Sequence, residues 1–264
     1  MSPTLKILYL GDIVGRPARE FIATNLQSIK KINDIDAIIA NAENATSGAG
    51  ITAEHAELLH SSGIDLMTLG DHVWDRYNFE HGIDDLEYIC RPANLPEECP
   101  GRDFVVLEKN GVKIGVCILL GRHFMKINAE CPFAAIAKLM RKNRSGVDIF
   151  LTEVHAEATS EKIALGWHLD GKVSAILGSH THVQTADERI LPNGSAYITD
   201  LGMCGPHESV IGREILPVIN TMRLGMPQKF EVATNDVRLN GAVLTIETAS
   251  GTAKKISRFS EKMS

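Results

Sequence analysis

Short apolar runs that each end in a small polar cluster are the feature that most constrains the fold of this chain. In the first half, runs at residues 5–10, 37–40 and 64–69 alternate with helix-like segments at 18–31 and 52–63. This alternation predicts strands packed between helices, which is the pattern of an α/β fold. The same signals predict later helices at 132–142, 159–169 and 214–224, and later strands at 104–109, 112–120, 147–154 and 173–177.

Glycine-containing turns indicate that the sheets are mixed. Asn110-Gly111 separates two strand-like runs, and this dipeptide is a strong signal for a tight hairpin between antiparallel strands. Further hairpin turns are expected at 192–194, at Asn240-Gly241 and at Ser250-Gly251. No repeat, linker or low-complexity segment is evident, so we expect residues 1–264 to form a single domain.

Polar clusters follow five of the predicted strands. In open α/β sheets the ligand crevice lies beyond the carboxyl ends of the strands, so residues far apart in the chain can meet there. Carboxylate, amide and imidazole groups without a thiolate suit manganese, iron, zinc or a mixed pair. Seven candidate ligands are more than one ion with open positions would use, which favours two ions: Asp12, Glu43, Asn44, Asp71, His155, His180 and His182.

Each candidate also has a simpler interpretation. Asp12 alone could be a turn former, and Glu43-Asn44 could be a polar turn. A single buried imidazole such as His155 is more often satisfied by a backbone carbonyl. The period-two spacing of His180 and His182 points both rings to one side of an extended segment, although such pairs also occur on solvated strands. The recurrence of these residue types at five strand ends favours the metal site.

Charge and cysteine usage exclude several other classes. With a formal net charge of -6, the chain has no general attraction for a phosphate polymer, so a phosphate-bearing substrate would need local positive charge. The five cysteines contain no C-x-x-C pair, which argues against a disulfide framework and a thiolate zinc site. The chain shows no signal-peptide layout, and no apolar stretch reaches the roughly 18 residues needed to span a bilayer. We therefore expect a cytoplasmic protein that does not associate with membranes.

Longer motifs resemble one known family. The chain is similar to the YmdB-like metallophosphoesterases of bacteria, within the calcineurin-like phosphoesterase superfamily. The resemblance runs nearly end to end and rests on GDIVG at 11–15, NAEN at 41–44, GDHVWD at 70–75, RPAN at 91–94, HAEATSE at 155–161 and GSHTHVQTAD at 178–187. It implies a sandwich of two mixed β-sheets flanked by helices, with a dinuclear metal site at the carboxyl ends of the strands. It also implies hydrolysis of phosphodiesters, including cyclic nucleotides.

The resemblance assigns roles to individual residues. Asp12, Asn44 and His182 would hold one ion together with Glu43. Asp71, His155 and His180 would hold the other, with Glu43 as the bridge. Iron or manganese is the expected metal, and zinc or magnesium are alternatives.

His72 would be the catalytic residue, free of the metals and acting as general acid on the departing oxygen while a metal-activated water attacks phosphorus. The alternative is that His72 only orients a ligand or caps a turn. One position departs from the family pattern Gly-Asn-His, because this chain has Gly70-Asp71-His72. An ionised Asp71 adds a third carboxylate to the set, which makes the site less electropositive.

Several questions remain open from the sequence. The expected substrate is a small phosphodiester such as a cyclic nucleotide, and RNA ends and homo-oligomer formation are further options. A phosphomonoesterase or nucleotidase, and a regulatory protein with a largely structural metal centre, are the competing functions. Arg91 and Arg122 are candidates for phosphate or sugar contact, and Glu157 could support the site or begin the following helix.

Overall fold

The computed structural model describes residues 3–263. Its helices are α1 (Gly15–Ile32), α2 (Ala53–Ser61), α3 (Pro132–Asn143), α4 (Thr159–Leu169) and α5 (Ile215–Leu224). Its strands are β1 (Thr4–Leu10), β2 (Asp12–Ile13), β3 (Ala37–Asn41), β4 (Leu66–Thr68), β5 (Ile89–Cys90), β6 (Val105–Lys109), β7 (Val112–Leu120), β8 (Ile149–His155), β9 (Ala175–Ser179), β10 (Arg189–Ile190), β11 (Ala196–Ile198), β12 (Met203–Pro206), β13 (Val237–Glu247) and β14 (Ala253–Lys262).

Both sheets are mixed, as predicted. Within residues 3–263, an eight-stranded sheet has the order β2-β12-β13-β1-β3-β4-β5, with β14 paired to β13. A six-stranded sheet has the order β10-β11-β9-β8-β7-β6. β1, β3, β4 and β5 run parallel, and so do β7, β8 and β9, whereas β13 lies antiparallel to β1. The carboxyl ends of the parallel strands therefore meet at one edge of each sheet.

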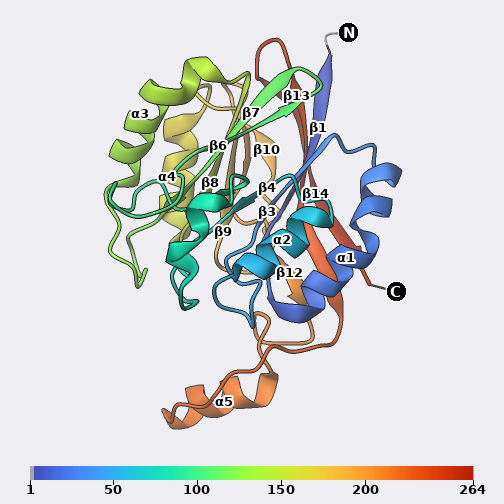
Figure 1. Ribbon diagram of the computed structural model, residues 1–264, viewed down its shortest axis with the longest axis vertical. Coiled ribbons are helices and arrows are strands. Elements are labelled where there is room, and N and C mark those ends of the chain that lie inside the picture. Colours follow the sequence, from blue (N-terminus) through green and yellow to red (C-terminus); the bar gives the residue numbers. More distant parts are fainter. Residues whose placement is uncertain (1–2, 264) are drawn as a thin grey trace.

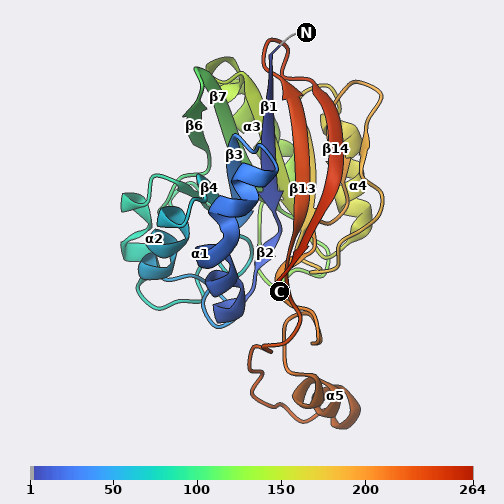
Figure 2. The same ribbon diagram turned by 90° about the vertical axis from the view of Figure 1, so that its right-hand side faces the viewer.

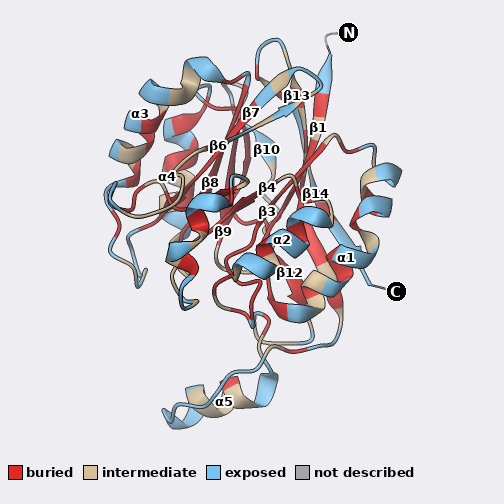
Figure 3. Ribbon diagram, in the orientation of Figure 1, coloured by how far each residue is buried: buried red, intermediate tan, exposed pale blue. Residues whose placement is uncertain are grey.

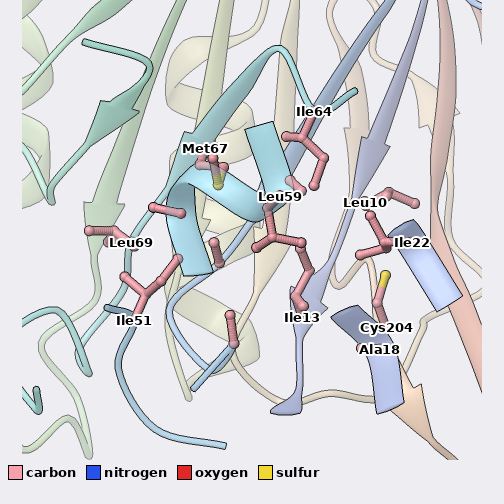
Figure 4. Packing of buried hydrophobic residues seen from close by; sticks show 14 of the residues in the cluster. Leu10, Ile13, Ala18, Ile22, Ile51, Leu59, Ile64, Met67, Leu69 and Cys204 are labelled. Atoms are coloured by element: carbon pink, nitrogen blue, oxygen red, sulfur yellow. The ribbon is translucent and has the colours of Figure 1, made fainter. Parts of the chain in front are cut away.

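The two sheets lie face to face between two layers of helices (Figures 1 and 2). One hydrophobic cluster joins the eight-stranded sheet to α1 and α2, and Figure 4 shows part of it, including Leu10, Ile22, Leu59 and Met67. A second cluster fills the space between the sheets, and a third packs the six-stranded sheet against α3 and α4. Figure 3 shows the resulting buried centre.

Alternation along β1 explains how one strand serves two of these clusters. Successive side chains of a strand point to opposite faces. Leu8 and Leu10 face the helices, whereas Ile7 and Tyr9 face the other sheet. All four are fully buried, so β1 reads as a continuous apolar run, as expected for a strand covered on both faces.

Three of the four predicted hairpin turns are confirmed. Asn110 and Gly111 have φ of 53° and 76° and connect β6 to β7, which matches the tight turn expected of Asn-Gly. The turn at 192–194 joins the antiparallel pair β10 and β11, and the turn at Gly251 joins β13 to β14.

The predicted turn at Asn240-Gly241 is wrong. Both residues lie inside β13, where Gly241 pairs with Leu10 on one side and Phe259 on the other. A Cβ atom at Gly241 would lie 2.2 Å from the carbonyl oxygen of Tyr9. The glycine is therefore required for close approach between two central strands, which is the other common reason for glycine in a strand.

Helix α5 stands away from the sandwich (Figure 2). Its apolar side chains are unusually exposed, with Leu216 at 71% and Met222 at 80%. Among residues 3–263, no helix is both long enough and apolar enough to cross a bilayer.

Replacing Gly241 by alanine tests the close-approach interpretation. We expect Gly241→Ala to lower the free energy of unfolding by at least about 2 kcal/mol, because the new methyl group overlaps a backbone carbonyl in the sheet centre. Urea denaturation measures the change. Gly82→Ala is the matched control, since its Cβ would meet no atom within 4 Å, and a similar loss in both variants would contradict the interpretation.

Candidate metal centre

The five predicted strand ends converge on one place between the two sheets. Asp12 follows β1, Glu43 and Asn44 follow β3, and Asp71 follows β4. The second sheet contributes His155 at the end of β8, with His180 and His182 after β9. The seven predicted ligands therefore come from both sheets.

Four side chains form the tightest group. The Nε2 atom of His155 lies 3.1 Å from Oε1 of Glu43 and 3.0 Å from Oδ1 of Asp71. It also lies 3.0 Å from Nδ1 of His180. One ligand atom from each of Glu43, Asp71, His155 and His180 lies within 4.8 Å of the others. A single ring nitrogen cannot donate to three partners at once, so this arrangement suits a shared cation.

Two of the remaining predicted ligands, Asn44 and His182, lie next to Glu43 and to each other. The amide nitrogen of Asn44 lies 3.0 Å from Oε1 of Glu43 and 3.3 Å from Nε2 of His182. Nδ1 of His182 lies 3.0 Å from the carbonyl oxygen of Ile211, so it carries the proton and leaves the Nε2 lone pair directed at the centre. Glu43 thus contacts a member of each predicted ligand set, His155 and Asn44.

Asp12 is fully buried and incompletely satisfied. Its Oδ2 atom accepts a hydrogen bond of 3.2 Å from the backbone N–H of His180. Its Oδ1 atom has no hydrogen-bond partner among the described residues. An unpaired buried carboxylate oxygen is costly, and a metal ion is one of the groups that can satisfy it.

The electrostatics of the cluster favour a cation. Burial raises the pKa of Asp12 to about 7, and Glu43 adds to this effect. Burial lowers the pKa of His155, but the neighbouring Glu43 and Asp71 carboxylates outweigh it and raise that pKa well above its usual value. Both shifts indicate a site that needs positive charge, which bound metal ions would supply.

Gly70 allows the carboxylates and imidazoles to approach each other. A Cβ atom at this position would lie 2.3 Å from Oε2 of Glu43 and 2.4 Å from Nε2 of His155. Any other residue at position 70 would therefore occupy the space where the ligand atoms meet. The glycine just before Asp71 is a requirement of the site rather than of the turn.

A buried carboxylate that the sequence reasoning gave no role fixes the orientation of His155. Nδ1 of His155 lies 2.9 Å from Oγ of Ser179, and Ser179 donates to Oε1 of Glu153. Because the serine hydroxyl gives its hydrogen to Glu153, it accepts the Nδ1 hydrogen of His155. The Nε2 lone pair is then free for a metal ion. A charged residue two positions before His155 in an apolar strand was the available sequence signal.

The histidine pair reaches the centre for a different reason from the one predicted. β9 ends at Ser179, so His180 and His182 lie in a turn with φ of 95° and 64°, and not on an extended segment. The buried Lys162–Asp200 pair holds this turn: Lys162 donates to the Ser179 carbonyl at 2.7 Å, and Asp200 accepts from the backbone and hydroxyl of Thr181. Strained backbone of this kind persists where its surroundings fix it.

His72 lies beside the cluster without joining it. Its backbone N–H donates to Oε2 of Glu43 at 3.0 Å, and its Nδ1 lies 2.6 Å from Oδ2 of Asp75. The ring is partly exposed and lines a cavity of about 270 Å³ together with Glu43, His180 and His182. Asp75, which sequence reasoning left without a role, orients the ring.

Other predicted contacts divide into three cases. Arg91 is buried and donates to the backbone carbonyls of Pro92, Cys99 and Pro100, so its proposed phosphate contact is wrong. Oε2 of Glu157 lies 3.2 Å from Nε2 of His180, before α4 begins. Arg122 lines a separate hollow.

Arg213 also lies at the site, although no sequence pattern predicts it. It lines the cavity beside His72 and donates to the carbonyls of Ser47 and Gly48.

Comparison with known proteins places the chain in a family. The family model described as YmdB-like protein matches residues 8–259. A 2′,3′-cyclic-nucleotide 2′-phosphodiesterase from Bacillus subtilis is 39% identical over 255 residues, which cover 97% of this chain and 96% of that protein.

Two solved structures are similar throughout. One is a hypothetical protein from Thermus thermophilus, with a TM-score of 0.92, 36% identity, and coverage of 98% of this chain and 100% of that one. The other is a novel phosphatase from Mycoplasma pneumoniae, with a TM-score of 0.93, 34% identity, and coverage of 99% and 95%.

The fold and the site together define a class, namely two-sheet α/β proteins with a carboxylate–imidazole cluster at the carboxyl ends of their strands. The chain belongs to the YmdB-like family. The predicted calcineurin-like sandwich of two mixed sheets is confirmed.

Ser179 offers a test of the buried support for His155. We expect Ser179→Ala to weaken metal binding by about tenfold to a hundredfold, because His155 loses the acceptor that fixes its tautomer. Titration of metal-stripped protein with Mn²⁺ or Zn²⁺ in a calorimeter measures the affinity.

Tyr9→Phe is the matched control for this variant. It removes another donor to Glu153, the Tyr9 hydroxyl at 2.7 Å, but leaves Ser179 in place. Metal affinity should then stay close to wild type while stability falls. Equal losses of affinity in the two variants would show that Ser179 acts only through the general stability of the core.

Proposed function

We propose that this protein is a metal-dependent phosphodiesterase that hydrolyses 2′,3′-cyclic nucleotides. The observation that carries the proposal is the convergence of Glu43, Asp71, His155 and His180 beside a partly exposed His72. The printed activity of the Bacillus subtilis relative supports the substrate class.

The residues fit a pair of metal ions. Glu43, Asp71, His155 and His180 would hold one ion, and Asp12, Glu43, Asn44 and His182 the other. Oxygen and nitrogen donors without thiolate suit iron or manganese, and zinc or magnesium are alternatives. When bound, the two ions supply the charge that activates water and neutralises phosphate oxygens. The Oδ1 atom of Asp12, which has no hydrogen-bond partner among the described residues, supports a bound cation at this site.

His72 would handle the proton of the leaving group. The oxygen of water joins phosphorus, the bond between phosphorus and the ribose 2′ oxygen breaks, and that oxygen receives a proton. The product is a nucleoside 3′-phosphate. His72 would donate this proton from Nε2, because Asp75 engages Nδ1.

Buried hydrogen bonds would keep two of the predicted ligands, His155 and His182, in place during this reaction. Ser179 and Glu153 hold His155, and the Ile211 carbonyl holds His182. Electrostatic stabilisation of a transition state is most effective where the charged groups do not reorganise. The chain therefore contributes orientation and proton transfer to a reaction whose charge the metals would balance.

A phosphomonoesterase and a regulator with a structural metal are the alternative functions. A two-metal clamp can bind either kind of phosphate ester. Parallel rates on bis-p-nitrophenyl phosphate and p-nitrophenyl phosphate separate diester from monoester hydrolysis. A protein that unfolds when its metal is removed, but hydrolyses neither ester when the metal is bound, would favour the regulator.

Metal removal and replacement test the proposal directly. Chelated protein should lose hydrolysis of adenosine 2′,3′-cyclic phosphate, because the carboxylates alone repel an anionic substrate. Activity should return with Mn²⁺ or Fe²⁺, and the product should be adenosine 3′-phosphate by chromatography. Full activity after verified metal removal, or faster turnover of monoesters than diesters, would contradict the proposed function.

The role of His72 predicts an effect that depends on the leaving group. His72→Ala should lower kcat on adenosine 2′,3′-cyclic phosphate by about 10²- to 10⁴-fold, because a ribose oxygen leaves poorly without a proton. The loss on bis-p-nitrophenyl phosphate should be much smaller, because p-nitrophenolate needs no proton to leave. His81→Ala removes an exposed histidine and is the control. Unchanged kcat on the cyclic nucleotide with full metal content would remove His72 from this role.

A further inference from the structure

A second hollow lies next to the metal centre. The loop between β7 and α3 lines a cavity of about 520 Å³ with Arg122, His123 and Lys126, closed by the first turn of α3 and by Glu161. This volume is within the range of small-molecule sites. We call this cavity the cationic hollow. It is separate from the candidate metal centre, because none of these residues belongs to that centre.

A smaller hollow connects the two places. It is lined by Asp71, His72, Trp74 and Asp75 beside the candidate metal centre and by Lys126 and Ile127 from the loop. Lys126 and Ile127 also line the cationic hollow. A substrate bound at the metals can therefore extend past His72 and Trp74 toward Arg122.

Two cationic side chains line the cationic hollow. Arg122 and Lys126 line it, and neither side chain forms a hydrogen bond or ion pair among the described residues. The carboxylate Glu161 already accepts the backbone N–H groups of Arg122 and His123, at 3.0–3.1 Å. Both side chains are exposed, so they place local positive charge at one edge of the candidate site in a chain of net charge -6.

The first turn of α3 adds to this preference. The cavity wall includes Cys131, Pro132 and Phe133, where the helix begins, and Cys131 makes no side-chain cap. Pro132 has no N–H, so the free amide groups of this first turn are those of Phe133 and Ala134, and such groups favour a bound anion. The loop itself is anchored, because Met125 and Ile127 pack against the hydrophobic core.

We propose that the cationic hollow binds a second phosphate of the substrate, so that the enzyme prefers 2′,3′-cyclic phosphates carrying another phosphate over simple cyclic mononucleotides. A short oligonucleotide ending in a 2′,3′-cyclic phosphate and a cyclic nucleotide with a 5′-phosphate share this chemistry. Trp74 offers a ring beside the path, on which a base can stack. The inference rests on the proposed function and deepens it by naming the substrate class.

Three substrates test this preference. They are adenosine 2′,3′-cyclic phosphate, the same nucleotide with a 5′-phosphate, and the dinucleotide ApA with a 2′,3′-cyclic end. Wild type should show a higher kcat/KM for the last two, and added salt should reduce the advantage because ions screen exposed charges. A gain for the dinucleotide alone identifies an internucleotide phosphate as the ligand, and equal gains show that any second phosphate suffices.

The double variant Arg122→Ala, Lys126→Ala assigns the preference to the hollow. We expect kcat/KM to fall about tenfold on the two-phosphate substrates and less than about twofold on adenosine 2′,3′-cyclic phosphate. The double variant Arg141→Ala, Lys142→Ala removes the same charge from exposed positions at the far end of α3 and is the control.

The outcomes separate this inference from the proposed function. If wild type hydrolyses all three substrates with similar kcat/KM, or if the variant loses equally on all of them, the second-phosphate site is overturned and the phosphodiesterase stands. If metal-loaded wild type hydrolyses none of the three, both are overturned. If the control variant loses as much kcat/KM on the two-phosphate substrates, the effect comes from the overall charge of the protein. That result would also overturn the second-phosphate site.

Discussion

The buried carboxylate of Glu153 is the interaction on which the site and the sandwich both depend. It lies in β8 of the six-stranded sheet and accepts hydrogen bonds from Tyr9, Asn41 and Thr68, which lie in β1, β3 and β4 of the other sheet. Hydrogen bonds to a charged group contribute roughly 1.5–3 kcal/mol each, and an unpaired buried carboxylate is strongly unfavourable. The two sheets are thus joined at one specific register beneath the metal centre.

This cross-link connects directly to the predicted metal ligands. Asn41 donates to Glu153 and accepts the backbone N–H of Glu43 at 3.0 Å, so the loop that carries Glu43 starts from the cross-link. Ser179 connects the same carboxylate to His155. Ligands from two different sheets can be held to within about 0.5 Å only if the sheets themselves are fixed at that point.

The sequence predicted the parts of this arrangement that depend on local patterns. Apolar runs identified the main strands, and the polar residues at their ends identified the residues that meet, because parallel strands deliver their ends to one edge. Long-range requirements were not visible. Gly241 looks like a turn residue until its distance to the Tyr9 carbonyl is known, and His180 and His182 look extended until the Lys162–Asp200 pair is seen to bend the chain. Arg91 looks like a phosphate ligand until its carbonyl partners are known.

The distribution of charge reconciles an acidic chain with an anionic substrate. Glu43 and Asp71, and Asp12 where it is ionised, bring negative charge to the centre, so these carboxylates by themselves repel phosphate where the reaction would occur. Bound metal ions would reverse that sign only close to the residues that hold them. Attraction farther along a substrate has to come from side chains, and the cations of the loop after β7 lie where such attraction would act. Arg213 cannot serve in this way, because its guanidinium already donates to the backbone carbonyls of Ser47 and Gly48. An extended substrate would therefore be oriented by the difference between the paired Arg213 and the unpaired cations of the loop, with its second phosphate directed toward the loop.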